Sequence, residues 1–247
     1  MTPITNSFSK VNPKDTRSGY NVSSSAGRRV GTTEEQHVAE KELNWKFAED
    51  FVIESEAISA ARAQSLEVGI EPISPAVGAQ LAVIAAASSA GSIIEIGTGA
   101  GVSGLWLLRG APEAVLTSID SEIDHQQLAR AAFTSAGVPA NRARLIAGRA
   151  LDVLPRMNEA SYDIVLIDAD AASVIEYVEH GLRLARSGGT VLVAHALWRD
   201  RVSNPAQRDD TTTAFRTLLA EIAKSDAVVA ALTPVGDGLL QITKIGD

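Results

Sequence analysis

A glycine-rich turn directly after a short apolar segment is the feature that most restricts how this chain can fold. Residues 93–96 are apolar except for Glu95, and three glycines follow, Gly97, Gly99 and Gly101. The next residues are small or apolar and predict a helix. A buried strand that leads through a tight turn into a helix is typical of parallel α/β sheets, where nucleotide-like cofactors bind. The segment therefore predicts a cofactor site at this turn.

The spacing of the glycines separates two classes of cofactor. A dinucleotide fingerprint has glycine at its first, third and sixth positions. Counted from Gly97, the sixth position is Val102. This spacing argues against a nicotinamide-dependent oxidoreductase, which we keep as an alternative class of enzyme.

Strands and helices alternate along the rest of the chain. Apolar segments predict strands at 92–96, 114–119, 143–147, 162–167 and 190–193. Helices are predicted at 77–87, 102–108, 124–136, 174–184 and 211–224. A turn-rich linker joins two further strands, 227–232 and 239–245, as a hairpin. The order predicts an α/β fold: a Rossmann-like, doubly wound, mostly parallel seven-stranded sheet with one antiparallel strand from the C-terminal hairpin.

The sequence divides into a polar arm and one folded domain. Residues 1–33 are rich in Ser, Thr, Asn, Gly and basic residues, and they predict a flexible N-terminal arm. Residues 34–247 are long enough for one domain with a sizeable core. Before the prolines at 72 and 75, apolar residues lie at spacings suited to helix faces: Leu43, Phe47, Phe51, Ile58 and Leu66.

Composition narrows the choice of partners. The formal net charge of -8 disfavours nonspecific binding to nucleic acid or to an anionic membrane, so we expect neither as a partner. The chain has no cysteine, which excludes disulfides and thiolate chemistry and fits a reducing, cytoplasmic location. No apolar segment approaches the ~20 residues of a membrane span, and the N-terminus lacks the apolar core of a signal peptide.

Polar side chains follow the predicted strands at the point where each strand ends. Glu95 and Asp120 end the first two strands, and Asp168, Asp170 and His195 follow two others. Ligands bind at the carboxyl ends of such strands. A carboxylate at the end of the second strand can accept both ribose hydroxyls of a nucleotide. Each acid alone could be a helix cap or a loop charge, but their coincidence predicts a binding site.

The motifs together resemble one enzyme family. Residues 34–247 look like the class I S-adenosylmethionine (SAM)-dependent O-methyltransferases of the catechol and caffeoyl-CoA O-methyltransferase family, in particular its small bacterial members. The resemblance rests on segments spread over the domain: 73–78, 95–99, 119–120, 148–150, 163–170, 197–198 and 236–239. It implies a SAM-dependent methyltransferase domain that acts on a small-molecule substrate, and it suggests a homodimer.

The resemblance also assigns a SAM pocket to particular residues. Ile73 would contact the cofactor from the preceding loop, and Asp120 would hold the ribose. The other cofactor residues that it implies are Glu95, Gly97, Thr98, Ser103, Ser121, Ala150 and Asp170. Among these, Ser103 would bind the methionine carboxylate near a helix N-terminus, where backbone N–H groups favour an anion.

The sequence departs from the family at the catalytic centre. Family members carry Asp-Ala-Asp-Lys at the fourth strand and Asp-Asn after the fifth, and three of these side chains hold a divalent metal such as Mg or Mn. Here Asp168 is retained, Ala171 replaces the lysine, and Ala194-His195 replaces Asp-Asn. Three interpretations follow. Asp168 and His195 could bind a metal, His195 could be a general base without one, or His195 could be a strand-end polar residue satisfied by the backbone.

We interpret the chain as a SAM-dependent O-methyltransferase that methylates a hydroxyl of a small, aromatic molecule. His195 and Asp168 are the predicted catalytic residues, and Asp168 and Trp198 the predicted substrate contacts. A cofactor-binding protein that has lost catalysis stays open as an alternative. The remaining histidines, His37, His125 and His180, are expected at the surface, and Trp45 and Trp106 are expected in packing.

Overall fold

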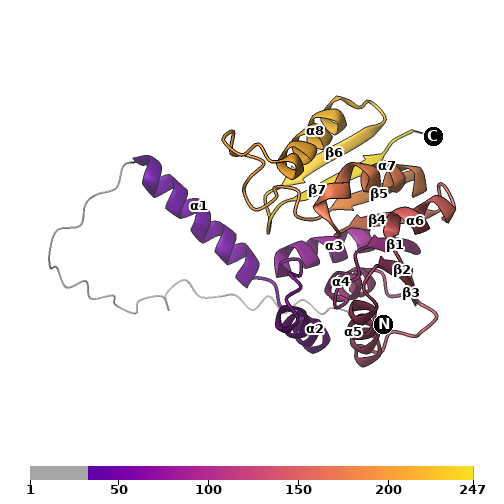
Figure 1. Ribbon diagram of the computed structural model, residues 1–247. Helices are drawn as coiled ribbons and strands as arrows, with labels where there is room; N and C mark the ends of the chain where they lie inside the picture. The colour runs from indigo at the N-terminus through magenta and orange to yellow at the C-terminus, as the bar shows by residue number, and fades with distance from the viewer. Residues whose placement is uncertain (1–32, 247) are drawn as a thin grey trace, which may run out of the picture. The chain divides into compact units, whose positions relative to one another are not determined.

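A seven-stranded sheet forms the centre of the fold in the computed structural model, which describes residues 33–246 (Figure 1). Its order is β3-β2-β1-β4-β5-β7-β6. The strands are β1 (Ser92–Ile96), β2 (Val115–Asp120), β3 (Ala143–Ala147), β4 (Tyr162–Ile167), β5 (Ala185–Val193), β6 (Val228–Thr233) and β7 (Leu239–Lys244). β7 pairs antiparallel with both β5 and β6, and the other pairs are parallel. The predicted doubly wound sheet with one antiparallel strand is confirmed.

Helices cover both faces of this sheet. One buried cluster combines the sheet with α2 (Glu56–Glu67), α3 (Pro75–Ala87), α4 (Val102–Gly110) and α5 (Ile123–Ser135). The opposite cluster contains the short α6 (Ala150–Val153), α7 (Val174–Leu184) and α8 (Asp210–Lys224). Neighbouring residues of β1 point to opposite faces, so Ile93 lies in the first cluster and Ile94 in the second. Burial on both faces explains why most residues of the central strands β1, β2 and β4 are apolar.

The chain separates into two units, residues 1–40 and 41–247. Helix α1 (Thr33–Asp50) crosses this boundary, and everything below concerns the second unit. The predicted flexible arm lies outside the described residues except for Thr33, where α1 begins. Its boundary with the domain therefore stays a prediction. In the described part, none of the helices is long and apolar enough to cross a membrane.

Helix boundaries follow local chemistry at both ends. The Ser74 hydroxyl accepts a hydrogen bond from the backbone N–H of Val77 at 3.3 Å, and Pro75 occupies the first turn of α3. Gly137 follows α5 with a φ of 74°. Glycine adopts this left-handed conformation without strain, and the predicted helix stop at this position is confirmed.

The fifth strand begins earlier than predicted. β5 starts at Ala185, whereas the glycines at 188 and 189 predict a loop before a strand at 190. The register between β4 and β5 shifts at this point. A Cβ atom on Gly189 would lie 2.9 Å from the carbonyl oxygens of Arg186 and Tyr162. The glycine therefore permits close backbone approach at an irregularity inside the strand.

Several apolar side chains near the N-terminal end of the domain are exposed. Of the apolar residues at the predicted helix faces, Ile58 is buried. The other four are largely exposed: Leu43 67%, Phe47 74%, Phe51 78% and Leu66 60%. Trp45 is 54% exposed, so its expected packing role is wrong within the described residues, whereas Trp106 is buried as expected.

Candidate active site

A cavity of about 380 Å³ lies at the carboxyl ends of β1, β2, β3 and β4. Its wall includes the glycine turn after β1, the end of β2, the start of α6 and the segment after β4. Six of the residues assigned from the sequence line it: Gly97, Asp120, Ser121, Ala150, Asp168 and Asp170. Ile73, Thr98 and Ser103 line an adjoining cavity of about 60 Å³, to which Gly97 and Asp168 also contribute. The structure thus brings most of the predicted site residues together.

The turn after β1 depends on Gly97. Its φ is 93°, in the left-handed region. A Cβ atom at this position would lie 1.9 Å from the carbonyl oxygen of Asp168. The backbone N–H of Asp168 in turn donates to the carbonyl of Ile96 at 2.8 Å. Glycine is required here because the ends of β1 and β4 touch through their backbones.

Glu95 is buried beneath the turn and lines neither cavity. Its exposed fraction is 0%. Its carboxylate accepts hydrogen bonds from the Ser103 hydroxyl at 2.6 Å and the Ser118 hydroxyl at 2.5 Å. Thr98 and Ser118 hydroxyls are also paired, at 2.7 Å. Burial raises the pKa of Glu95 from 4.5 to about 7, although the two serine hydroxyls lower it in part. Glu95 and Ser103 therefore face each other in the structure, so the contacts of both with a cofactor stay predictions.

The raised pKa of Glu95 makes the stability of the fold depend on pH. The folded state binds the proton more tightly than the unfolded chain, so this stabilisation is complete below about pH 4.5 and is lost as pH rises through about 7. The expected loss is on the order of 3 kcal/mol. Urea unfolding of the wild type and of Glu95→Gln across this range should give stability curves that converge or cross as pH rises. Parallel curves would contradict the buried titration.

Asp120 organises the backbone of the glycine turn. One carboxylate oxygen accepts hydrogen bonds from the N–H groups of Thr98 and Gly99, both at 3.0 Å. The other accepts from the N–H of Glu122 at 2.9 Å and lies 3.5 Å from Nδ1 of His125. His125 also lines the larger cavity. The side chain is 32% exposed, as expected for a surface histidine, but it also belongs to the cavity wall, which the sequence did not indicate.

Replacing Asp120 with alanine should weaken binding of S-adenosylhomocysteine, the product form of the cofactor, by about tenfold to a hundredfold. The variant lacks a charged hydrogen-bond acceptor in the cavity. It also lacks the carboxylate that accepts from the backbone N–H groups of the glycine turn. Isothermal titration calorimetry measures the affinity. Asp124→Ala, which removes an exposed carboxylate from the first turn of α5, four residues further along the chain, is the matched control. Equal affinities for the two variants would refute the role of Asp120.

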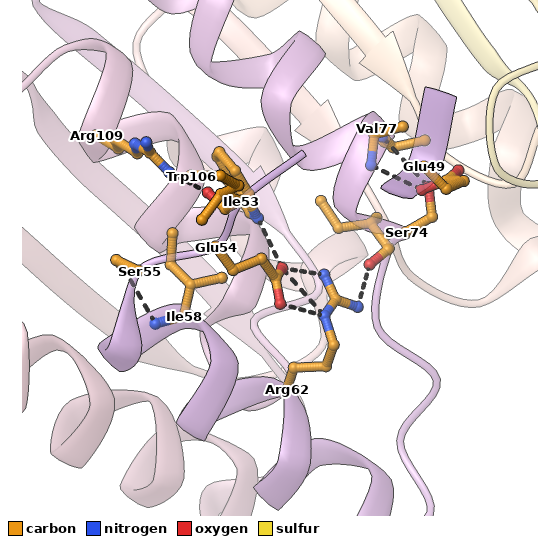
Figure 2. A network of polar contacts seen from close by, with 12 residues as sticks. Glu49, Ile53, Glu54, Ser55, Ile58, Arg62, Ser74, Val77, Trp106 and Arg109 are labelled. Carbon is orange, nitrogen blue, oxygen red and sulfur yellow. Dashed lines mark hydrogen bonds and ion pairs between the residues drawn. The ribbon is translucent and has the colours of Figure 1, made fainter. Parts of the chain in front are cut away.

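A network of polar contacts holds the loop that carries Ile73 (Figure 2). The Arg62 guanidinium pairs with the Glu54 carboxylate at 2.7 Å and donates to the carbonyl of Ile73 at 2.5 Å. Glu49, near the end of α1, accepts hydrogen bonds from the Ser74 hydroxyl at 2.8 Å and the N–H of Ala76 at 2.9 Å. The wall of the smaller cavity is therefore fixed by side chains from α1, α2 and the segment between them.

Asp168 and His195 meet at the ends of β4 and β5. His195 Nε2 lies 3.6 Å from an Asp168 carboxylate oxygen, and the Asp168 side chain is 19% exposed. Burial raises the pKa of Asp168 above its ordinary value, and the nearby Glu71 carboxylate raises it further, while His195 opposes both. A separation of 3.6 Å exceeds a hydrogen bond, so the pair has no direct bond to break before a substrate hydroxyl contacts it.

The other imidazole nitrogen of His195 faces a residue that the sequence did not single out as functional. Nδ1 lies 3.4 Å from a carboxylate oxygen of Asp237, in the turn between β6 and β7. The interpretation of His195 as a residue satisfied by the backbone is therefore not the arrangement found, because both nitrogens face carboxylates. His195 has a φ of 55°, which is uncommon for a residue with a side chain.

The remaining candidates divide between the cavity and the core. Asp170 lines the cavity and accepts a hydrogen bond from the Tyr177 hydroxyl at 2.5 Å. Burial, and then this contact with Asp170, raises the pKa of Tyr177 to about 12. Trp198 stacks on Phe215 with ring centroids 5.6 Å apart, which indicates a packing role, and its predicted contact with the substrate stays a prediction.

The side chains at the catalytic centre do not fit a resident divalent metal. In residues 33–246, no three His, Cys, Asp or Glu side chains form a group that could hold one. Asp168 and His195 supply two donors, and Ala194 supplies none from its side chain. Magnesium prefers six oxygen ligands in a regular geometry. We therefore derive no step of the reaction through a metal.

Comparisons with known proteins agree with this geometry. The model of the O-methyltransferase family matches residues 56–245. A Mycobacterium tuberculosis protein named as a probable O-methyltransferase is 45% identical over 197 residues, which cover 79% of this chain and 88% of that protein.

Two solved structures are also similar. A Corynebacterium glutamicum protein has a TM-score of 0.77 and 30% identity, over 85% of this chain and 98% of its own. The O-methyltransferase TomG of Streptomyces achromogenes, solved in complex with SAM, has a TM-score of 0.73 and 29% identity, over 83% and 96% of the two chains. These findings overturn the oxidoreductase alternative: the chain belongs to the O-methyltransferase family.

Proposed function

We propose that this SAM-dependent O-methyltransferase methylates a hydroxyl group of a small aromatic molecule, with His195 as the general base. The observation that carries the proposal is the placement of His195 beside Asp168, a residue of the wall of both cavities. The cofactor would occupy the larger cavity, against the glycine turn and the cavity-lining carboxylates of Asp120 and Asp170. A volume of about 380 Å³ falls within the usual range for small-molecule sites.

The reaction needs a proton acceptor as well as a methyl donor. The acceptor oxygen attacks the sulfonium methyl group, a C–O bond forms, and the C–S bond breaks to leave S-adenosylhomocysteine. The hydroxyl proton moves to Nε2 of His195. The residues must hold the oxygen about 3–3.5 Å from the methyl carbon and in line with the C–S bond.

The choice of base supports an aromatic acceptor. A phenol such as that of tyrosine has a pKa near ~10, whereas water, which resembles an aliphatic alcohol in acidity, has one near ~15.7. Histidine titrates near neutral pH and removes the phenolic proton far more readily. A metal would relax this preference, because it can acidify a weaker hydroxyl.

Methyl transfer to matched panels of phenols and aliphatic alcohols tests the proposal. The full chain is incubated with methyl-labelled SAM and each acceptor, with and without EDTA. We expect methylated phenol and S-adenosylhomocysteine in equal amounts, unchanged by EDTA, and little transfer to alcohols. Tight cofactor binding without transfer to any acceptor would support lost catalysis. Loss of transfer with EDTA, restored by Mg or Mn, would support the metal-assisted route.

We also propose that the chain works as a homodimer in the cytoplasm. Large apolar side chains of α1 and the segment after it are exposed, including Phe47 at 74% and Ile53 at 82%. Exposed apolar surface of this kind often marks a protein interface. Sedimentation of the wild type and of a Phe47→Glu, Ile53→Glu double variant tests the dimer. A dimer that persists in the double variant would exclude these side chains from its interface.

The absence of cysteine supports the proposed location in the cytoplasm, a reducing compartment.

A further inference from the structure

We propose that Asp237 is a positioning residue for His195: its carboxylate favours the ring proton on Nδ1 and thereby leaves Nε2 free to take the substrate proton. The two side chains come from turns that are 42 positions apart in the sequence, and Asp237 Oδ2 lies 3.4 Å from His195 Nδ1. Asp168 lies on the opposite side of the ring, 3.6 Å from Nε2. The imidazole is therefore placed between two carboxylates, of which Asp168 alone lines the cavities.

The Asp237 carboxylate is held in place by backbone hydrogen bonds that do not involve the imidazole. Both of its oxygens accept from the backbone N–H of Arg199, at 2.7 and 2.9 Å. The backbone carbonyls of Asp237 and Gly238 accept from the N–H groups of Leu197 and Ala196, at 2.9 and 3.0 Å. These bonds tie the turn between β6 and β7 to the segment that follows β5. The Arg199 N–H thus holds the carboxylate, and the backbone at Ala196 and Leu197 holds the turn that carries it.

Close packing at the same place leaves the two turns little freedom. A Cβ atom on Gly238 would lie 2.6 Å from the side chain of Leu197 and 2.8 Å from its backbone nitrogen. In the segment that follows His195, the backbones of Trp198, Arg199 and Asp200 are also left-handed, with φ of 48°, 53° and 60°. A segment of this shape presents the Arg199 N–H to Asp237, and the His195 ring lies between Asp237 and Asp168.

The arrangement selects one neutral tautomer of His195. A carboxylate faces each ring nitrogen, but Asp237 lies closer, at 3.4 Å against 3.6 Å for Asp168, and the Arg199 N–H holds its carboxylate in place. The proton of the neutral ring is therefore favoured on Nδ1, because an ionised carboxylate accepts a hydrogen bond and cannot donate one. Nε2 then carries the free electron pair on the side of Asp168. When the acceptor hydroxyl gives its proton to Nε2, the imidazolium cation lies between the two carboxylates. Asp237 keeps its own charge throughout and takes no proton from the ring.

Asp237→Asn is the discriminating variant, and the inference rests on the proposed role of His195 as base. The amide oxygen can still accept from the Arg199 N–H, but the amide NH₂ then faces Nδ1 and favours the proton on Nε2. We expect turnover to fall by at least about tenfold, with the melting temperature and the affinity for S-adenosylhomocysteine close to wild type. Asp200→Asn removes an exposed carboxylate from the same segment and is the matched control, with turnover unchanged.

A double-mutant cycle separates positioning from a structural role. If Asp237 acts through His195, then Asp237→Asn should add little to the loss already caused by His195→Ala. Independent, multiplicative losses would overturn the proposal. So would normal turnover in Asp237→Asn.

Nitrogen-15 NMR of the imidazole tests the pairing without any turnover. With the ring signals of His195 assigned by comparison with His195→Ala, the wild type should show the Nδ1–H tautomer above the titration of the ring, and Asp237→Asn should show the Nε2–H tautomer. An Nε2–H wild type would overturn the inference even if methyl transfer occurs. Conversely, an Nδ1–H wild type that depends on Asp237, in a protein that methylates no acceptor, would refute the proposed function and leave the pairing in place.

Discussion

Replacing His195 with alanine should reduce the rate of methyl transfer about a hundredfold or more and leave cofactor affinity close to that of the wild type. General bases contribute on this scale because the unassisted hydroxyl must otherwise lose its proton to water. His195 lines neither cavity, and its contacts are with Asp168 and Asp237, so the cofactor wall stays intact without it. Single-turnover kinetics with a phenol, together with calorimetry for S-adenosylhomocysteine, measures both quantities.

His180→Ala provides the matched control for this variant. His180 lies on α7 and is partly exposed, and its loss removes the same ring from a position outside both cavities. Its turnover should equal that of the wild type. Near-normal turnover in His195→Ala would show that another group, or solvent, takes the proton. A parallel loss of cofactor affinity would show instead that His195 supports the pocket rather than the chemistry.

The substitution Gly97→Ala should destabilise the fold by about 3 kcal/mol or more and abolish measurable cofactor binding. The added methyl group would lie 1.9 Å from the Asp168 carbonyl oxygen, so the ends of β1 and β4 must move apart. The left-handed φ of 93° adds backbone strain. Urea unfolding and calorimetry with S-adenosylhomocysteine measure the two effects.

Gly137→Ala separates the collision from the strain. Gly137 also has a left-handed φ, 74°, but no atom lies within 4 Å of a Cβ built there. This control should lose about 1–2 kcal/mol, the cost of a left-handed backbone for a residue with a side chain, and should bind the cofactor normally. If the two variants lose the same stability, the contact between β1 and β4 has no energetic importance.

Much of the fold could be predicted because its strands are buried on both faces. Mostly apolar segments with an acid at or beside their carboxyl ends identify β1, β2 and β4 without knowledge of their neighbours. The start of β5 could not be predicted, because a glycine pair reads as a loop unless the partner strand is known to approach closely. The exposure of apolar residues such as Phe47 could not be predicted either, because periodicity indicates a helix face but not whether another element covers it.

The sequence pointed to the residues of the candidate site that lie at strand ends, but not to those that reach it from other elements. Asp120, Asp168 and His195 follow strands whose carboxyl ends must share one edge of the sheet, so their order along the chain suffices. Tyr177 and Asp237 reach the same region from a helix and a hairpin turn, and such contacts depend on the packing of distant segments. The motif around Gly236 did point to the turn, but it gave no reason to pair Asp237 with His195.

The network around Arg62 has a thermodynamic consequence for the whole cofactor wall. Glu49 on α1 provides acceptors for Ser74 and the first turn of α3, and Arg62 holds the carbonyl of Ile73. The end of α1 and the lining of the smaller cavity are therefore stabilised by the same hydrogen bonds. If the cofactor contacts Ile73 as proposed, linkage between the two is reciprocal: ordering the end of α1 should tighten cofactor binding, and a bound cofactor should order the end of α1 by the same free energy. We therefore expect Glu49, which lines neither cavity, to influence affinity for SAM through the loop that carries Ile73.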